Sequence, residues 1–176
     1  MNGQEESQTQ PERTDPDLQG SEISTLTQFL DYHRATLRMK CAGLGADDLK
    51  RHSVPPSTLT LLGLVRHLTE VERNWFGRML DGQPHAPIYY SDSDPDGDFD
   101  TLDSASVEEV WRAYQAAVTE SRRIAATFGD PADLARGSTG RPRTLRWVLV
   151  HLIEEYARHN GHADILREAI DGSVGE

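Results

Sequence analysis

The sequence of 176 residues contains little of what several classes of protein require. It has one cysteine, Cys41, which excludes a disulfide within the chain and favours a reducing compartment such as the cytoplasm. It has 18 Lys and Arg against 29 Asp and Glu, so it lacks the excess of cations that nucleic acids and anionic membrane surfaces attract. No stretch approaches the roughly 18 uninterrupted apolar residues of a transmembrane helix. We therefore expect a cytoplasmic protein that binds neither nucleic acid nor membranes.

The first part of the chain is also poor in apolar residues. Residues 1–20 are polar, acidic and contain proline, and we predict that they form a disordered acidic tail and not a signal peptide. The rest of the chain, residues 21–176, has enough apolar side chains for one core, and we predict a single domain there.

Four segments repeat apolar residues at helical spacing, and none shows the alternation of a strand. We expect helices over about 21–42, 57–80, 107–128 and 144–172. Ser57 or Thr58 is the expected N-cap of the second helix, and Ser106 with Glu109 forms a capping box before the third. The expected apolar side of the second helix consists of Leu61, Val65, Leu68, Trp75 and Met79. This pattern predicts an all-α fold, a four-helix bundle with long connecting loops.

A long acidic connection, residues 83–103, separates the second and third helices. Its Asp92-x-Asp94-x-Asp96-Gly97 segment superficially fits a calcium loop. Prolines disrupt the incoming helix that an EF-hand requires, so we interpret the segment as a solvated loop, which is long enough to act as a lid.

The last helix carries metal-ligand residue types in its apolar stripe. Glu155, His159 and His162 lie in or beside this stripe, whereas Glu154 points away. A carboxylate on a buried stripe needs a partner, and residues four apart place two ligand atoms on one face. A single His is more often a core residue, and a single Glu-x-x-x-His is more often a surface pair, but the cluster favours a metal site. The site then needs a ligand from another helix, for which His67 is the candidate.

The segments LVRHLTEVERNWF and HLIEEYARHNGHADILRE together resemble the DinB/YfiT-like metalloenzyme superfamily, in its actinobacterial branch related to mycothiol-dependent enzymes. The resemblance implies a four-helix bundle with three metal ligands, here His67, Glu155 and His159. Many members have His where this chain has Glu155, but the set is similar to the His, Glu, His set of mycothiol-dependent maleylpyruvate isomerases. His162 corresponds to a family Gln. The same register also allows His159 and His162 as ligands with Glu155 as an acid or base.

Two imidazoles and a carboxylate suit zinc, with nickel, iron and manganese as alternatives. Three protein ligands leave coordination positions open, which is typical of a catalytic site. The resemblance implies that a mycothiol-like thiol, or else water, is activated there to attack a small electrophilic substrate, in the manner of a thiol S-transferase or isomerase. His162, His151 and Arg158 are candidates to support the ligands or contact substrate. A non-catalytic bundle that binds metal or a small ligand is the alternative, and the chain is expected to be a monomer or homodimer.

Overall fold

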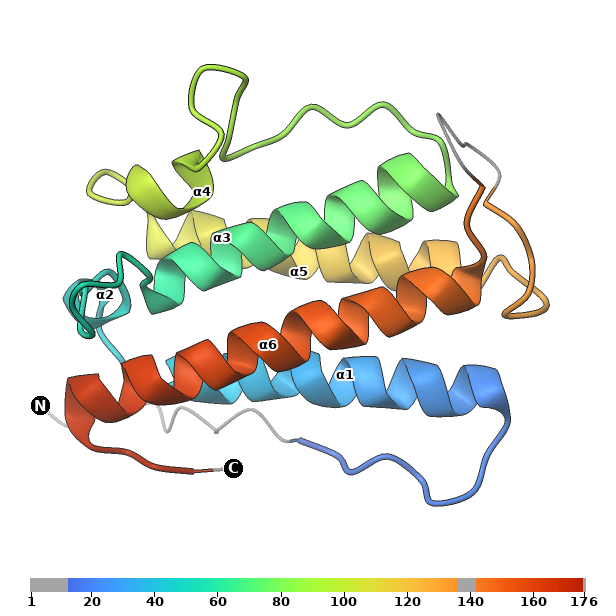
Figure 1. Ribbon diagram of the computed structural model, residues 1–176, viewed down its shortest axis with the longest axis horizontal. Helices are drawn as coiled ribbons and strands as arrows, with labels where there is room; N and C mark the ends of the chain where they lie inside the picture. The colour runs from blue at the N-terminus through green and yellow to red at the C-terminus, as the bar shows by residue number, and fades with distance from the viewer. Residues whose placement is uncertain (1–12, 136–141, 176) are drawn as a thin grey trace, which may run out of the picture.

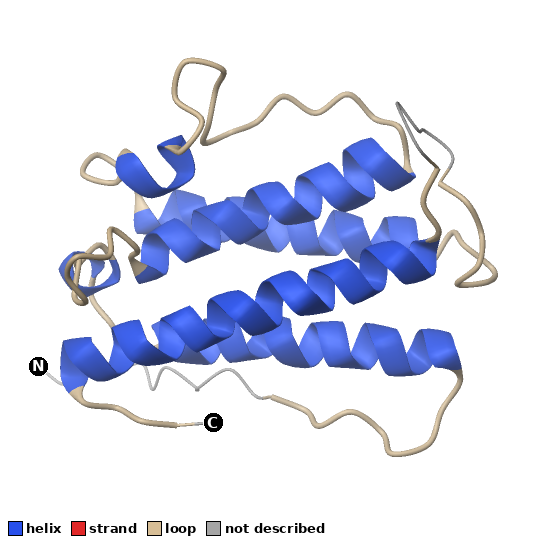
Figure 2. Ribbon diagram, in the orientation of Figure 1, coloured by secondary structure: helices blue, strands red, loops and turns tan. Residues whose placement is uncertain are grey.

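The computed structural model describes residues 13–135 and 142–175, and its regular structure is helical (Figure 2). The described residues form no strand beyond two isolated bridges, which confirms the predicted all-α fold. None of the helices in these ranges is long and apolar enough to cross a membrane. The elements in chain order are α1 (Glu22–Cys41), α2 (Ala46–Leu49), α3 (Leu61–Glu72), its π-helical continuation η1 (Arg73–Leu80), α4 (Gly97–Asp100), α5 (Val107–Ala125) and α6 (Leu145–Asp171).

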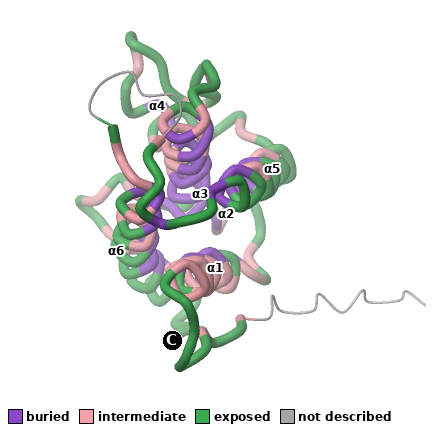
Figure 3. Tube along the Cα trace, turned by 90° about the vertical axis from the view of Figure 1, so that its right-hand side faces the viewer, coloured by how far each residue is buried: buried purple, intermediate pink, exposed green. Residues whose placement is uncertain are grey.

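The four long helices form two pairs. α1 packs mainly on α6, α3 with η1 packs on α5, and α3 also contacts α6. Figure 1 shows that α1 and α6 run in one direction and that α3 and α5 run in the other. Since α3 and α5 are parallel, the chain between them must return along the length of the bundle, which is the role of the long acidic connection. Seen along its axis in Figure 3, the bundle has its buried segments facing the centre.

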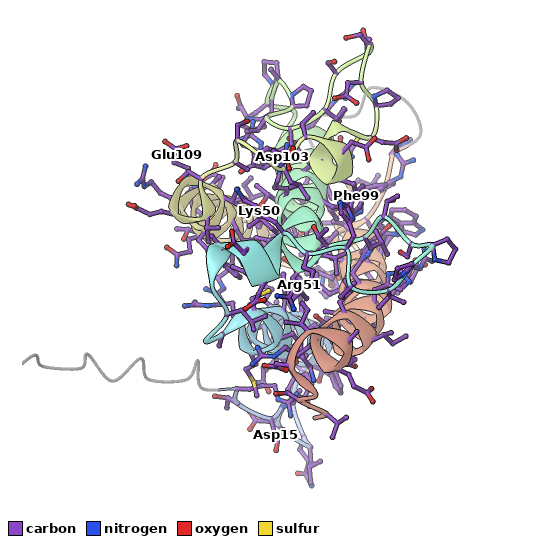
Figure 4. The ribbon with its side chains drawn as sticks, turned by 90° about the vertical axis from the view of Figure 1, so that its left-hand side faces the viewer. Asp15, Lys50, Arg51, Phe99, Asp103 and Glu109 are labelled. Carbon is purple, nitrogen blue, oxygen red and sulfur yellow. The ribbon has the colours of Figure 1, made fainter. Side chains whose placement is uncertain are left out.

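The acidic connection contacts the bundle in its second half, shortly before the chain enters α5. It carries α4, which contacts α3. Beyond α4, the backbone oxygen of Asp103 accepts a hydrogen bond from Lys50 Nζ at 3.0 Å (both labelled in Figure 4). The connection is therefore fixed to the bundle at the end where α2 and α4 lie.

Side-chain caps define the helix starts. Ser21, Ser106 and Thr144 each accept a hydrogen bond from a backbone N–H in the first turn of α1, α5 and α6. The prediction of Ser57 or Thr58 as the cap of the second helix was wrong, because Thr60 accepts from Gly63 N at 3.0 Å and α3 begins after it.

The second long helix changes its pitch at Arg73. Asp81 N donates to Phe76 O at 3.0 Å, an i to i−5 bond typical of a π-helix. Wider turns rotate the following side chains away from α-helical register. Phe76 and Leu80 are consequently buried, whereas the predicted core residue Trp75 is only partly buried and lies at the edge of the core.

The tail predicted for residues 1–20 falls mostly outside the described residues, which begin at Arg13. From there to α1 the chain is irregular but contacts α1. The Arg13 guanidinium lies over the ring of Tyr32 at 4.4 Å, and Asp17 N donates to Gln28 Oε1. The boundary between tail and domain stays a prediction.

A buried polar network connects all four long helices. Arg34 of α1 forms a two-pronged pair with Glu72 of α3, with both N–O distances at 2.8 Å. Tyr156 Oη of α6 lies 2.8 Å from Glu72 Oε1 and 3.0 Å from Tyr114 Oη of α5. Although burial acts to lower it, the carboxylate of Glu72 raises the pKa of Arg34, so the guanidinium stays charged. The network fixes the relative positions of the helices one turn beyond His67.

Candidate metal centre

His67, Glu155 and His159 lie together in the structure. Each offers one ligand atom, and these atoms all lie within 4.8 Å of one another. α3 supplies His67, and α6 supplies the other two from consecutive turns of one face. No other group of three or more His, Cys, Asp or Glu side chains meets this criterion in the part of the chain that the structure describes.

The spacing of the three side chains fits a small divalent ion. Ligand atoms about 2.0–2.1 Å from a tetrahedral ion are separated from one another by about 3.3 Å. Nε2 of His159 already lies 3.5 Å from Oε2 of Glu155. The ligand atom that His67 offers lies within 4.8 Å of those of the other two residues. Two imidazoles and one carboxylate are also the donor chemistry of a catalytic zinc site.

One ring nitrogen of His67, Nδ1, has a hydrogen-bond partner, and Nε2 lies on the opposite side of the ring from that partner. Its Nδ1 lies 2.8 Å from Oδ2 of Asp98, a buried residue of α4. Phe99, the next residue, stacks on the imidazole with ring centroids 5.0 Å apart and is labelled in Figure 4. α4 therefore covers His67 on one side, while the ring approaches His159 on the other at 4.7 Å between centroids.

Glu155 contacts two histidines through its two oxygens. Oε2 faces His159, and Oε1 lies 3.4 Å from Nε2 of His151. His151 is enclosed by two indole rings, since it stacks on Trp147 at 5.0 Å and meets Trp75 edge-on at 4.5 Å. This packing holds the imidazole of His151 beside the carboxylate of Glu155.

His159 is the most buried of the three. Burial, followed by repulsion from His67 and His162, lowers the pKa of His159 from 6.5 to about 4. At neutral pH the ring is consequently uncharged and keeps a lone pair for a metal ion. Nδ1 of His162 lies 3.4 Å from Nδ1 of His159, so a proton on this side of His159 leaves Nε2 free on the side of Glu155.

The other residues singled out from the sequence lie elsewhere. Arg158 forms an ion pair with Glu154 on the exposed face of α6, and the structure does not bring its guanidinium into the cluster. Cys41 is buried, and burial raises the pKa of its thiol to about 12. Cys41 is therefore not a nucleophile for this site.

A comparison with protein families shows the family to which the chain belongs. The family model described as Mycothiol-S-transferase matches residues 25–172. The chain belongs to the mycothiol S-transferase family. This match confirms the resemblance to the DinB/YfiT-like superfamily and its mycothiol-related enzymes. A search of curated proteins gave no match. The part of the chain that this family covers includes α1 from residue 25 onward, all of α3, α5 and α6, and all three candidate ligands.

Sequence reasoning did not find Asp98 or the two tryptophans around His151. Asp98 is one of many aspartates in an irregular segment, where no periodicity indicates which side chain turns inward. Trp75 was assigned to the core because an α-helical register was assumed through the π-helical turns. The four-residue spacing of Trp147 and His151 on α6 was the one available signal.

Proposed function

We propose that this member of the mycothiol S-transferase family is a metal-dependent enzyme that joins a low-molecular-weight thiol such as mycothiol to a small electrophile. The observation that carries the proposal is the convergence of His67, Glu155 and His159 within 4.8 Å in a chain of this family. We further propose that these three side chains bind a divalent ion, with zinc first and nickel, iron or manganese as alternatives.

The three protein ligands leave coordination positions for a thiol or water. His67, Glu155 and His159 would hold the ion, which would favour the thiolate form of a thiol bound there. The thiol proton then passes to solvent, and the sulfur lone pair forms a bond to the electrophilic carbon as the bond to a leaving group breaks. The protein's own contribution is positional. His151 lies against one oxygen of Glu155, which leaves the other oxygen for the site.

Electrostatics within the cluster support this assignment. The carboxylate of Glu155 would supply negative charge to a bound divalent ion, and the lowered pKa of His159 keeps its ring neutral at the pH of a cell. Metal binding then requires no deprotonation of His159, in contrast to a histidine that is charged in the free protein.

The test measures consumption of mycothiol with 1-chloro-2,4-dinitrobenzene as a model electrophile, by protein stripped with a chelator and by protein reloaded with Zn²⁺. We expect turnover only in the reloaded protein. Glu155→Ala should lose it, and Glu168→Ala is the matched control because that glutamate is exposed on the same helix, 13 residues after Glu155. Equal turnover by stripped and reloaded protein would rule out the metal-dependent reaction.

A second function is a non-catalytic bundle that binds a small ligand. The observation that favours it is a groove of about 820 Å³ between α1 and α5, whose lining includes Arg34, Tyr114 and Arg122 and none of the three candidate ligands. Tight Zn²⁺ binding without any thiol consumption would support this function over the transferase.

A further inference from the structure

Asp98 differs from the other aspartates of the acidic connection. Asp92, Asp96, Asp100 and Asp103 are exposed, but Asp98 is 5% exposed. A buried carboxylate costs several kcal/mol unless it is paired or hydrogen-bonded. The partner of Asp98 is His67, whose Nδ1 lies 2.8 Å from Oδ2.

This contact determines which nitrogen of His67 is available. An ionised carboxylate only accepts hydrogen bonds, so Nδ1 of His67 carries the proton and donates it to Asp98. In a neutral imidazole the lone pair then lies on Nε2. Asp98 is not one of the residues whose ligand atoms converge within 4.8 Å, and the cluster residue to which it is hydrogen-bonded is His67.

We infer that Asp98 is a positioning residue for the candidate ion, and that it holds His67 in the tautomer and orientation that present Nε2. The inference rests on the proposed metal-binding function. Metal-bound histidines commonly donate their second N–H to a carboxylate, and loss of this partner typically weakens metal binding about 10- to 100-fold.

The fold holds Asp98 in place by contacts from α3 itself. Arg66, beside His67, donates from Nη2 to Gly97 O at 2.8 Å and from Nη1 to Thr101 O at 2.7 Å. The side chain of Arg66 is therefore hydrogen-bonded to the backbone on both sides of Asp98. One turn after Arg66, Glu70 Oε1 accepts from Tyr89 N at 2.8 Å.

These attachments have a consequence for the acidic connection. One face of α3 supplies the ligand His67 and also Arg66 and Glu70, which bind the connection. The acidic connection, which the chain needs in order to return from α3 to the start of α5, thus also places the carboxylate of Asp98 beside His67. In this structure α4 is part of the site and not a solvated loop.

The experiment compares Zn²⁺ affinity, by competition with a chromophoric chelator, in the wild-type protein, Asp98→Asn, Asp98→Ala and Asp100→Asn. Asp100 is the matched control, because it lies on the same short helix, is exposed and loses the same charge. We expect both Asp98 variants to bind Zn²⁺ about 10- to 100-fold more weakly and Asp100→Asn to bind within twofold of wild type. Wild-type affinity in both Asp98 variants would overturn the inference.

A second measurement is made on the wild-type protein, so it does not depend on whether the Asp98 variants fold. In Zn²⁺-loaded wild-type protein with ¹⁵N-labelled histidine, the imidazole shifts should show His67 coordinated through Nε2 and protonated at Nδ1, with His67→Gln providing the assignment. Coordination through Nδ1 would overturn the inference.

The outcomes separate the two proposals. Wild-type protein that binds no Zn²⁺ overturns both. Zn²⁺ binding that depends on His67 and Glu155 but not on Asp98 overturns the positioning role alone. Zn²⁺ binding that depends on Asp98, without thiol turnover, keeps the positioning role and overturns the transferase.

Discussion

Tyr156 and Glu72 share a hydrogen bond at 2.8 Å in the centre of the bundle. Tyr156 follows the candidate ligand Glu155 on α6. Glu72 is the last residue of α3 and lies five residues after the candidate ligand His67. The contact therefore fixes the two helices that carry the ligands relative to each other. Arg34 neutralises Glu72 from α1, so the position of the site depends on a charged network in the core.

Removal of Glu72 is expected to destabilise the protein strongly. Glu72→Ala leaves the guanidinium of Arg34 buried without its main counter-charge, and we expect the free energy of unfolding to fall by about 3 to 5 kcal/mol. Urea unfolding followed by circular dichroism measures the change. Glu120→Ala, which removes a largely exposed partner of Arg123, is the control, with an expected loss of no more than about 1 kcal/mol. Equal losses in the two variants would contradict the structural role of the network.

The sequence was sufficient to predict features that depend on local periodicity. It predicted the four long helices, and the four-residue spacing of Glu155 and His159 placed both on one face of α6. His67 was predicted from the need for a ligand on a second helix and from the family resemblance. In contrast, the inward turn of Asp98 depends on Arg66 and on the path of the chain back across the bundle. The π-helical turns at Arg73 equally depend on packing, which periodicity does not encode.

Cys41 should be unreactive in the folded protein. It is buried, and burial raises the pKa of its thiol to about 12, so at pH 8 almost none of it is thiolate. We expect no reaction with 5,5′-dithiobis(2-nitrobenzoate) at pH 8 and one equivalent of reaction after unfolding in guanidinium. Cys41→Ala should retain thiol turnover, because the proposed nucleophile is the added thiol. Loss of turnover in a folded Cys41→Ala protein would show that the chain supplies the sulfur.

The metal-free protein should lose stability in mild acid through His159. The folded-state pKa of His159 is about 4 and its usual value is 6.5, so between these values the unfolded chain binds a proton that the folded chain does not. Stability from this difference is fully present above pH 6.5 and is lost as the pH falls towards 4. The free energy of unfolding of the wild type should therefore rise more steeply with pH across this window than that of His159→Gln. Parallel pH profiles for the two proteins would contradict this expectation.

Two glycine substitutions should have opposite effects. A Cβ at Gly97 would lie 2.5 Å from the backbone oxygen of Tyr89 and 2.7 Å from Oδ2 of Asp94, whereas a Cβ at Gly161 in α6 meets nothing within 4 Å. We expect Gly97→Ala to shift α4, move Asp98 from His67 and weaken Zn²⁺ binding about tenfold or more. Gly161→Ala should retain Zn²⁺ affinity and stabilise the fold by about 0.5 to 1 kcal/mol, because alanine loses less entropy than glycine in a helix.

Chelator competition measures the Zn²⁺ affinity of both glycine variants, and urea unfolding of the metal-free proteins measures their stability. The comparison separates a displacement of α4 from a general effect of an added methyl group. Gly161 lies between His159 and His162 on α6, so it is closer in sequence to a candidate ligand than Gly97 is. Weakened Zn²⁺ binding in Gly161→Ala, with wild-type binding in Gly97→Ala, would contradict the contribution of α4. The reverse result would show that the acidic connection, through α4, contributes to the position of His67 on α3.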